Sequence, residues 1–73
     1  MIDRDTLEDH LRKAQAHVMQ GAGSIDRQRA VIASLEAGGH DSAAARQLLK
    51  TFEASQAMHI ADVTRLEGEL ARP

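Results

Sequence analysis

The sequence contains no cysteine, no tryptophan and no tyrosine, and it has only one phenylalanine and one proline. The lack of cysteine excludes disulfides, thiol catalysis and thiolate metal sites. The scarcity of aromatic side chains leaves no platform on which nucleic-acid bases could stack. Nine Lys and Arg against eleven Asp and Glu, with the two signs interspersed, give no basic stripe for a phosphate backbone. We therefore expect no nucleic acid among the partners of this protein.

Long hydrophobic runs are also missing. No stretch approaches the ~18 apolar residues that a membrane-spanning helix requires, so the sequence predicts no membrane partner. The segment MIDRDTLEDH at the start of the chain is too acidic and polar for a signal peptide. These features predict a cytoplasmic protein.

Aliphatic residues are abundant: hydrophobic residues make up 42% of the chain, and Ala, Leu, Ile, Val and Met supply most of them. This composition favours helices packed side by side over a sheet, so the expected fold class is all-α. At 73 residues the chain has room for one domain, residues 1–73, which would bury little surface by itself. We therefore expect the chain to associate with itself.

Apolar and small residues recur at alternating steps of four and three, which is the heptad pattern of packed helices. The pattern keeps its phase through the glycines at 21 and 23, so we predict one helix over about 6–37 and a second over about 42–71. The two runs, which we term the seam, predict an antiparallel two-helix hairpin of coiled-coil type. The seam consists of residues 7, 11, 14, 18, 21, 25, 28, 32 and 35 of the first helix and 45, 49, 52, 56, 59, 63, 66 and 70 of the second.

The segment Gly38-Gly39-His40-Asp41 separates the two heptad runs. Two glycines can take the left-handed conformation that closes a helix. The Asp41 side chain can accept a hydrogen bond from the free N–H groups that begin the next helix. These four residues therefore predict the turn of the hairpin.

Residues beside the seam test the hairpin, because positions whose numbers sum to about 80 lie at similar height if the chain folds back near residue 40. At such positions opposite charges meet and apolar residues meet. The sequence therefore predicts cross-helix pairs on two edges. One edge pairs Glu36 with Arg46, Arg29 with Glu53 and Ala22 with Ile60; the other pairs Val31 with Leu48, Ser24 with Ser55, His17 with Asp62 and His10 with Glu69.

Four large apolar residues, Met19, Val31, Leu48 and Ile60, fall outside the seam. They need another surface, and two hairpins packed as a four-helix bundle are the simplest closed arrangement. We expect a homodimer with these residues at its interface. Another oligomer, or the helices of a different and unidentified protein, would also cover them.

Three polar residues, Gln28, Gln56 and His59, fall within the seam. We expect the glutamines to specify register or oligomeric state, and His59 to be a hydrogen-bonded core histidine or a pH switch. A shift by one heptad preserves the apolar pattern, so the seam alone leaves the register open. His10 and His17 lie two helical turns, or about 10 Å, apart, which is too far to share a zinc ion within one chain. No metal or other cofactor is expected.

The segment RQRAVIASLEAGGHDSAAARQLLKTFEASQAMH, residues 27–59, resembles a group of short, uncharacterised bacterial proteins. In that group an RQ-containing helix runs into LE, a Gly-His-Asp turn, then LL, FE and a segment from Q to H. The resemblance implies a helical hairpin of the same build and brings no activity with it.

The segment AHVMQGAGSI, residues 16–25, looks like the phosphoacceptor region of histidine phosphotransfer domains, whose pattern is similar to His-x-Leu-Lys-Gly-Ser. The resemblance implies that His17 accepts a phosphoryl group and that Gly21 leaves space for a receiver domain. The lysine position is Gln20, which can hydrogen-bond phosphate but cannot neutralise its charge. We prefer the interpretation that the segment is the flexible middle of a helix with His17 beside Asp62. The cross-helix pairing that places His17 there also accounts for His10, Ser24 and Val31, whereas the phosphotransfer interpretation accounts only for His17 and its neighbours.

The sequence shows no nucleophile motif, so we predict no catalytic residues and no enzymatic activity. The expected function is that of a non-enzymatic, homo-oligomeric helical hairpin for protein–protein interaction or regulation. The alternative is a dimeric histidine phosphotransfer protein that uses His17.

Overall fold

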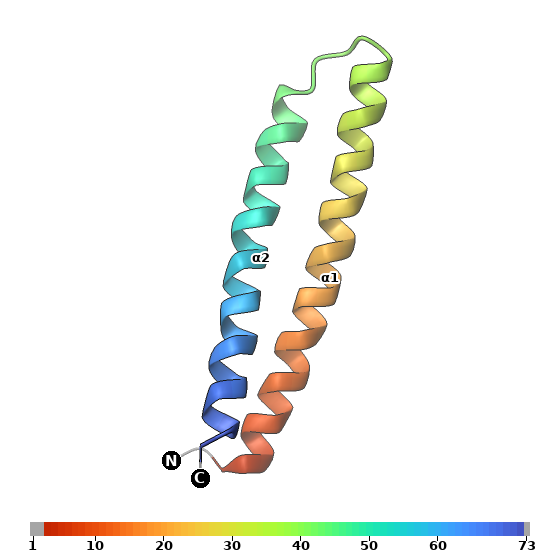
Figure 1. Ribbon diagram of the computed structural model, residues 1–73. Coiled ribbons are helices and arrows are strands. Elements are labelled where there is room, and N and C mark those ends of the chain that lie inside the picture. The colour runs from red at the N-terminus through yellow and green to blue at the C-terminus, as the bar shows by residue number, and fades with distance from the viewer. Residues whose placement is uncertain (1–2, 73) are drawn as a thin grey trace.

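The computed structural model describes residues 3–72, which fold into two long antiparallel helices joined by a short turn (Figure 1). Helix α1 spans Arg4–Ala37 and helix α2 spans Ala43–Leu70. α1 passes through the glycines at 21 and 23 without a break, as the continuous heptad phase predicts. The predicted all-α hairpin is confirmed, and each helix boundary lies within two residues of its predicted position.

α1 begins earlier than predicted because Asp3 caps it. Asp3 Oδ1 accepts a hydrogen bond from the backbone N–H of Thr6 at 2.8 Å, which satisfies one of the free donors of the first turn. At the same end of the hairpin, which we term the open end, the Arg4 guanidinium donates to the carbonyl of Leu70 over 3.2 Å. This bond joins the first turn of α1 to the last turn of α2.

The turn closes α1 through a left-handed glycine, as the sequence predicts. Gly39 has a φ of +73°. Its N–H donates to the carbonyl of Glu36 at 3.1 Å, and the N–H of His40 donates to the carbonyl of Leu35 at 2.8 Å. These two bonds form a Schellman motif, which supplies partners to carbonyl groups that the end of a helix leaves free.

The other turn residues end α1 and start α2. Gly38 is the C-cap residue of α1, and a Cβ added there would lie 2.9 Å from His40 Cδ2. The Asp41 carboxylate accepts a hydrogen bond from the N–H of Ala43 at 2.9 Å, as predicted. All four residues of the predicted turn therefore lie in the connection between the helices.

The seam lies between the two helices, and every one of its positions is buried or half-buried, as predicted. Between residues 3 and 72, no side chain is fully enclosed, because two helices cover a side chain from one side only. The most buried residues are spread along the length of the hairpin; they are Ala14, Ile25, Ile32 and Leu66.

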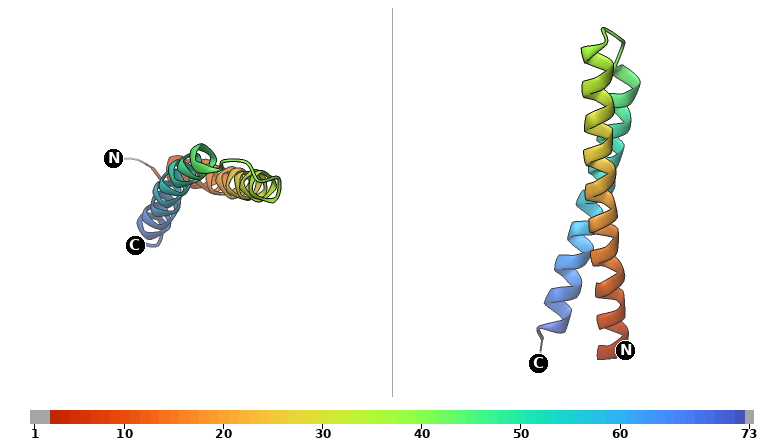
Figure 2. Two further views of the ribbon diagram at one scale, coloured as in Figure 1. Left: turned by 90° about the horizontal axis from the view of Figure 1, so that it is seen from above. Right: turned by 90° about the vertical axis from the view of Figure 1, so that its right-hand side faces the viewer.

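The hairpin is long and one layer thick (Figure 2). It measures 56 × 15 × 14 Å and its radius of gyration is 16.7 Å, whereas a compact chain of this length would have about 11 Å. It leaves 5356 Å² accessible to solvent, against about 4,400 Å² for a globular monomer of the same mass. A single layer of two helices therefore leaves two broad faces open.

Candidate functional site

Two long faces flank the seam, because residues seven apart on a helix return to the same side. They correspond to the two predicted edges. The charged face consists of Gln15, Ala22, Arg29 and Glu36 of α1 with Arg46, Glu53, Ile60 and Glu67 of α2. The histidine face consists of His10, His17, Ser24 and Val31 of α1 with Leu48, Ser55, Asp62 and Glu69 of α2.

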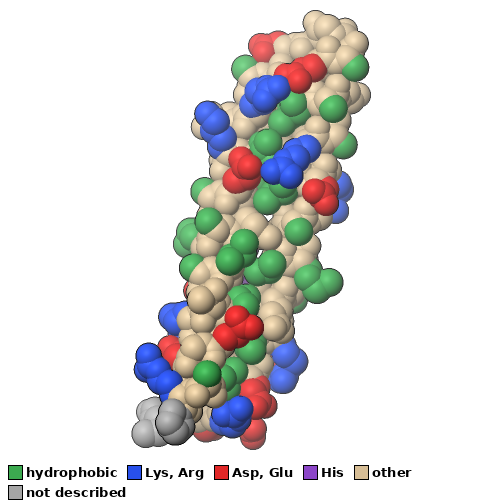
Figure 3. All heavy atoms as spheres, viewed as in Figure 1, with side chains coloured by type: hydrophobic (Ala, Val, Ile, Leu, Met, Phe, Trp, Pro, Cys, Tyr) green, Lys and Arg blue, Asp and Glu red, His purple; other side chains and the backbone are tan. Residues whose placement is uncertain are grey.

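Two ion pairs join the helices on the charged face, in the half nearer the turn. Arg46 donates to the Glu36 carboxylate, and Arg29 Nη2 lies 3.6 Å from Glu53 Oε2, so both predicted pairs are confirmed. Glu36 also accepts a hydrogen bond from Ser42 Oγ at 2.8 Å. The hydrogen bonds from Arg46 and Ser42 lower the pKa of the Glu36 carboxyl. In Figure 3, acidic and basic side chains gather near the turn and near the chain ends, with hydrophobic side chains between them.

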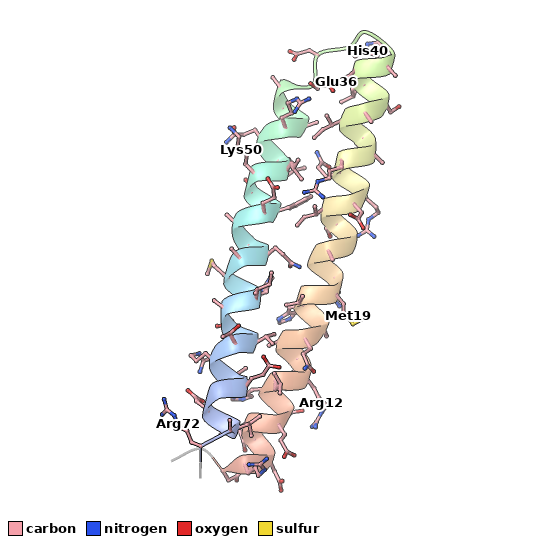
Figure 4. All side chains as sticks on the ribbon, viewed as in Figure 1. Arg12, Met19, Glu36, His40, Lys50 and Arg72 are labelled. Atoms are coloured by element: carbon pink, nitrogen blue, oxygen red, sulfur yellow. The ribbon has the colours of Figure 1, made fainter. Side chains whose placement is uncertain are left out.

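An apolar groove of about 430 Å³ occupies the other half of the charged face. Met19 and Ile60 line it and are 76% and 49% exposed. Figure 4 shows Met19 on the outer side of α1, away from α2. The lining residues are Gln15, Val18, Met19, Ile60, Val63, Thr64 and Glu67.

The histidine face holds a smaller hollow of about 220 Å³ beside Gly21. The imidazole rings of His17 and His59 meet there, with their centroids 5.1 Å apart and their planes inclined by 41°. Val31 and Leu48 lie on the same face nearer the turn and are 47% and 44% exposed. The hollow is lined by His17, Gln20, Gly21, Ser24, Phe52, Ser55, Gln56 and His59.

The exposed apolar residues are therefore divided between two faces. Met19 and Ile60 lie on the charged face, and Val31 and Leu48 lie on the histidine face. A further exposed residue, Met58, was missed by the sequence analysis, although its position outside the seam could have indicated it. It follows a position of the histidine face by three residues and so lies at the margin of that face. One flat interface cannot cover all of these side chains.

The glutamines of the seam reach the main chain of the opposite helix. Gln28 Nε2 donates to the carbonyl of Ala45 at 2.9 Å. Gln56 Nε2 donates to the carbonyl of Val18 at 2.8 Å. Both bonds are partly buried. They stabilise the helix pairing, because an amide that is removed from water without a hydrogen-bond partner would cost free energy.

Gly21 makes room for the side chain of Gln56. A Cβ atom at position 21 would overlap Gln56 Oε1 and lie 2.8 Å from Gln56 Cδ. Gly21 is the only seam position of α1 without a side chain, so it is the only one that leaves room for the Gln56 amide. A shift of one heptad would place this amide against a seam residue that has a side chain, and the two would collide. Gln56 Oε1 is buried and has no hydrogen-bond partner within residues 3–72. The register that the seam left open is therefore selected by this contact.

The two predicted pairs between histidine and carboxylate do not form. The Arg65 guanidinium lies 3.8 Å from Asp62 Oδ1 and 3.2 Å from Glu69 Oε1. Both acids are within about one helical turn of Arg65 on α2, whereas His10 and His17 would have to reach them across the seam. The predictions for His17 with Asp62 and for His10 with Glu69 are therefore wrong.

The phosphoacceptor pattern is matched only in part. His17 is exposed, as an acceptor of a phosphoryl group must be. The space beside Gly21 is filled by the Gln56 amide, and Gln20, at the lysine position of the pattern, is uncharged. The site thus offers an exposed imidazole without the lysine that would neutralise a phosphoryl group.

Within residues 3–72, no group of three or more His, Asp or Glu side chains is placed to hold a metal ion. Over the same part of the chain, neither helix combines the length and the hydropathy needed to cross a membrane. Comparisons with protein-family models, with curated proteins and with solved structures found no match to this chain. The function must therefore be inferred from the geometry of the two faces.

Proposed function

We propose that this protein is a non-enzymatic, homo-oligomeric helical hairpin that acts through protein–protein contacts, with a homodimeric four-helix bundle as its assembled form. The observation that carries the proposal is the exposure of large apolar side chains on a fold one layer thick. Among the described residues, four are buried, whereas five large apolar residues are exposed. Two further helices would add a second layer over the seam and over the exposed apolar side chains of one face.

The size of one face supports a dimer. A face of 56 × 15 Å projects on the order of 800 Å², which is what each partner contributes to a stable interface of standard size. Covering this face would also remove much of the excess accessible area of the single hairpin. A twofold dimer uses the same patch on both copies, so one face is enough to close the assembly.

Sedimentation equilibrium at micromolar concentration tests the proposal. We expect a mass near twice 7.9 kDa, with the helix content measured by circular dichroism in the same buffer. A fully helical monomer that persists up to millimolar concentration would contradict the homodimer.

A second candidate, a dimeric histidine phosphotransfer protein, is favoured by the exposure of His17 beside a hollow. Treatment with phosphoramidate, followed by mass spectrometry at neutral pH, tests it. His10 and His40 are also exposed and serve as controls within the same chain. Selective phosphorylation of His17 would support this candidate, whereas equal labelling of the three histidines would contradict it.

The proposal includes a cytoplasmic location, which cell fractionation tests, and a further protein partner for the face that the dimer leaves open. Affinity capture from the native cell, read by mass spectrometry, identifies such a partner. We also propose the same hairpin for the short bacterial proteins that residues 27–59 resemble.

A further inference from the structure

Both faces of the hairpin carry exposed apolar residues, so exposure alone does not determine which face a second copy covers. We propose that the histidine face is the dimer interface and that the two hairpins pack with their turns at the same end. The inference rests on the proposed homodimer and adds the face and the orientation to it.

The distribution of charge favours the histidine face. Its positions nearest the turn are the uncharged residues Ser24, Val31, Leu48 and Ser55. One charged group reaches them, because the Arg27 guanidinium donates to Ser24 Oγ at 3.2 Å. Over the same length the charged face carries two ion pairs between the helices. Removing such pairs from water costs more than their attraction returns unless the geometry is very favourable, and the cores of protein interfaces are accordingly depleted in charged residues. On the histidine face the acidic residues, such as Asp62, lie towards the open end, where they fall at the rim.

The larger groove around Met19 and Ile60 is the main argument for the charged face. It occupies only the half nearer the open end. Glu67 lines it at one end, and the ion pair of Arg29 with Glu53 lies between it and the turn. A helix as long as those of this hairpin cannot fill the groove without also covering these charges.

The order of residues along the histidine face determines the orientation. If the twofold axis runs along the hairpin, α1 of one copy lies on α2 of the other, and positions at similar height meet. Val31 then faces Leu48 of the second copy, and Ser24 faces Ser55 of the second copy. Apolar residues meet apolar residues, and small polar residues meet small polar residues.

The opposite orientation matches unlike residues. If the twofold axis runs across the hairpin, the turns lie at opposite ends and each helix lies on its own copy. With the axis at the level of Ser24 and Ser55, residues that lie equally far above and below these serines on the two copies face each other. Val31 faces His17 of the second copy, and Leu48 faces Asp62 of the second copy, which buries an apolar side chain against a carboxylate. The arrangement with both turns at one end avoids this mismatch.

Leu48→Glu and Ile60→Glu form a matched pair of tests for the face. The two side chains are 44% and 49% exposed in the single hairpin and lie on different faces. Neither change should unfold the helices, which circular dichroism verifies. We expect Leu48→Glu to weaken dimerisation on the order of a hundredfold, because a carboxylate would be buried in the interface, and Ile60→Glu to change it by less than about tenfold.

Sedimentation equilibrium of the two variants separates the outcomes. Dissociation by Ile60→Glu but not by Leu48→Glu would overturn the inference and leave the homodimer intact. Dissociation by both variants, or by neither, would also overturn it, because a single interface on the histidine face would then not explain the assembly. A monomeric wild-type protein would instead contradict the proposed function itself.

A spin label at the turn tests the orientation. The chain has no cysteine, so Ala37→Cys, at the exposed end of α1, gives one labelling site per copy. Packed helices lie about 8–10 Å apart, so turns at the same end should give a distance between labels below about 30 Å by pulsed electron resonance. A distance near the 56 Å length of the hairpin would overturn the proposed orientation.

Discussion

Replacing Gly21 with alanine tests the contact that selects the register. In an unobstructed helix interior, Gly→Ala stabilises by about 1 kcal/mol. At position 21 the new methyl group would overlap Gln56 Oε1 and lie 2.8 Å from Gln56 Cδ, so the amide must swing away and release its bond to the Val18 carbonyl. A hydrogen bond of this kind contributes about 1 kcal/mol, and the displaced amide also disturbs the seam. We therefore expect Gly21→Ala to leave the free energy of unfolding unchanged or lower it by up to about 1 kcal/mol.

Two other helical glycines provide controls. A Cβ at Gly68 would meet nothing within 4 Å, and a Cβ at Gly23 would lie 3.2 Å from Arg27 Nη1, the end of a flexible and exposed side chain. Alanine at either position should raise the free energy of unfolding by about 0.5–1 kcal/mol. In a Gln56→Ala background the obstacle is gone, so Gly21→Ala should recover the same gain.

Urea unfolding followed by circular dichroism measures these differences. All variants must be compared at one protein concentration, because dimerisation contributes to the stability of the fold. A Gly21→Ala variant as strongly stabilised as Gly68→Ala would refute the packing of Gln56 against Gly21.

Three further substitutions, the last with Met19→Ala as its control, test the charged face, the turn and the seam. Glu36→Gln should lower the melting temperature slightly at neutral pH, because the Arg46 and Ser42 hydrogen bonds hold the pKa of the folded Glu36 below its ordinary value of 4.5. This contribution is present above pH 4.5 and is lost as the pH falls through the folded pKa, so the difference between the variant and the wild type should shrink on acidification. A difference that stays the same at every acidic pH would contradict the pairing with Arg46. Gly39→Ala should cost about 1 kcal/mol in urea unfolding, because a side chain is strained at a φ of +73°; an unchanged midpoint would contradict the left-handed turn. Leu66→Ala removes a side chain that is only 3% exposed and should destabilise by about 2–4 kcal/mol, whereas Met19→Ala, at 76% exposure, should stay within about 0.5 kcal/mol; similar losses would show that the core is assigned wrongly.

The fold could be predicted because its causes are local in the sequence. The heptad spacing places apolar side chains on one stripe of each helix, and the stripe is the surface that the two helices bury. The turn could be predicted because glycine tolerates a positive φ and Asp41 supplies a short capping side chain. Both signals depend on neighbouring residues and hardly on the rest of the chain.

The details of the faces could be predicted only in part. The rule that pairs residues at similar height on the two helices predicted the ion pair of Glu36 with Arg46 correctly, because these two opposite charges lie across the seam from each other. The same rule failed for His17, because Arg65 on α2 competes for Asp62 at closer range. The contact of Gln56 with Gly21 depends on the register, which the apolar spacing leaves open.

The contacts between the helices differ widely in how much chain they enclose. The hydrogen bond of Arg46 to Glu36 joins residues 10 apart, that of Gln28 to Ala45 residues 17 apart, and that of Gln56 to Val18 residues 38 apart. The bond of Arg4 to Leu70 joins residues 66 apart. Closing a loop of 66 residues directly costs roughly 1.7 kcal/mol more conformational entropy than closing one of 10, so the early contacts in folding are those beside the turn.

Each contact that forms in this order shortens the loop that the next contact has to close. We therefore expect the helix pairing to form from the turn at Gly39 outwards and to open first at the end that carries Arg4 and Leu70. Amide hydrogens near Arg4 and Leu70 should exchange with solvent through local fraying, while those beside the turn should exchange only when most of the helix pair has separated.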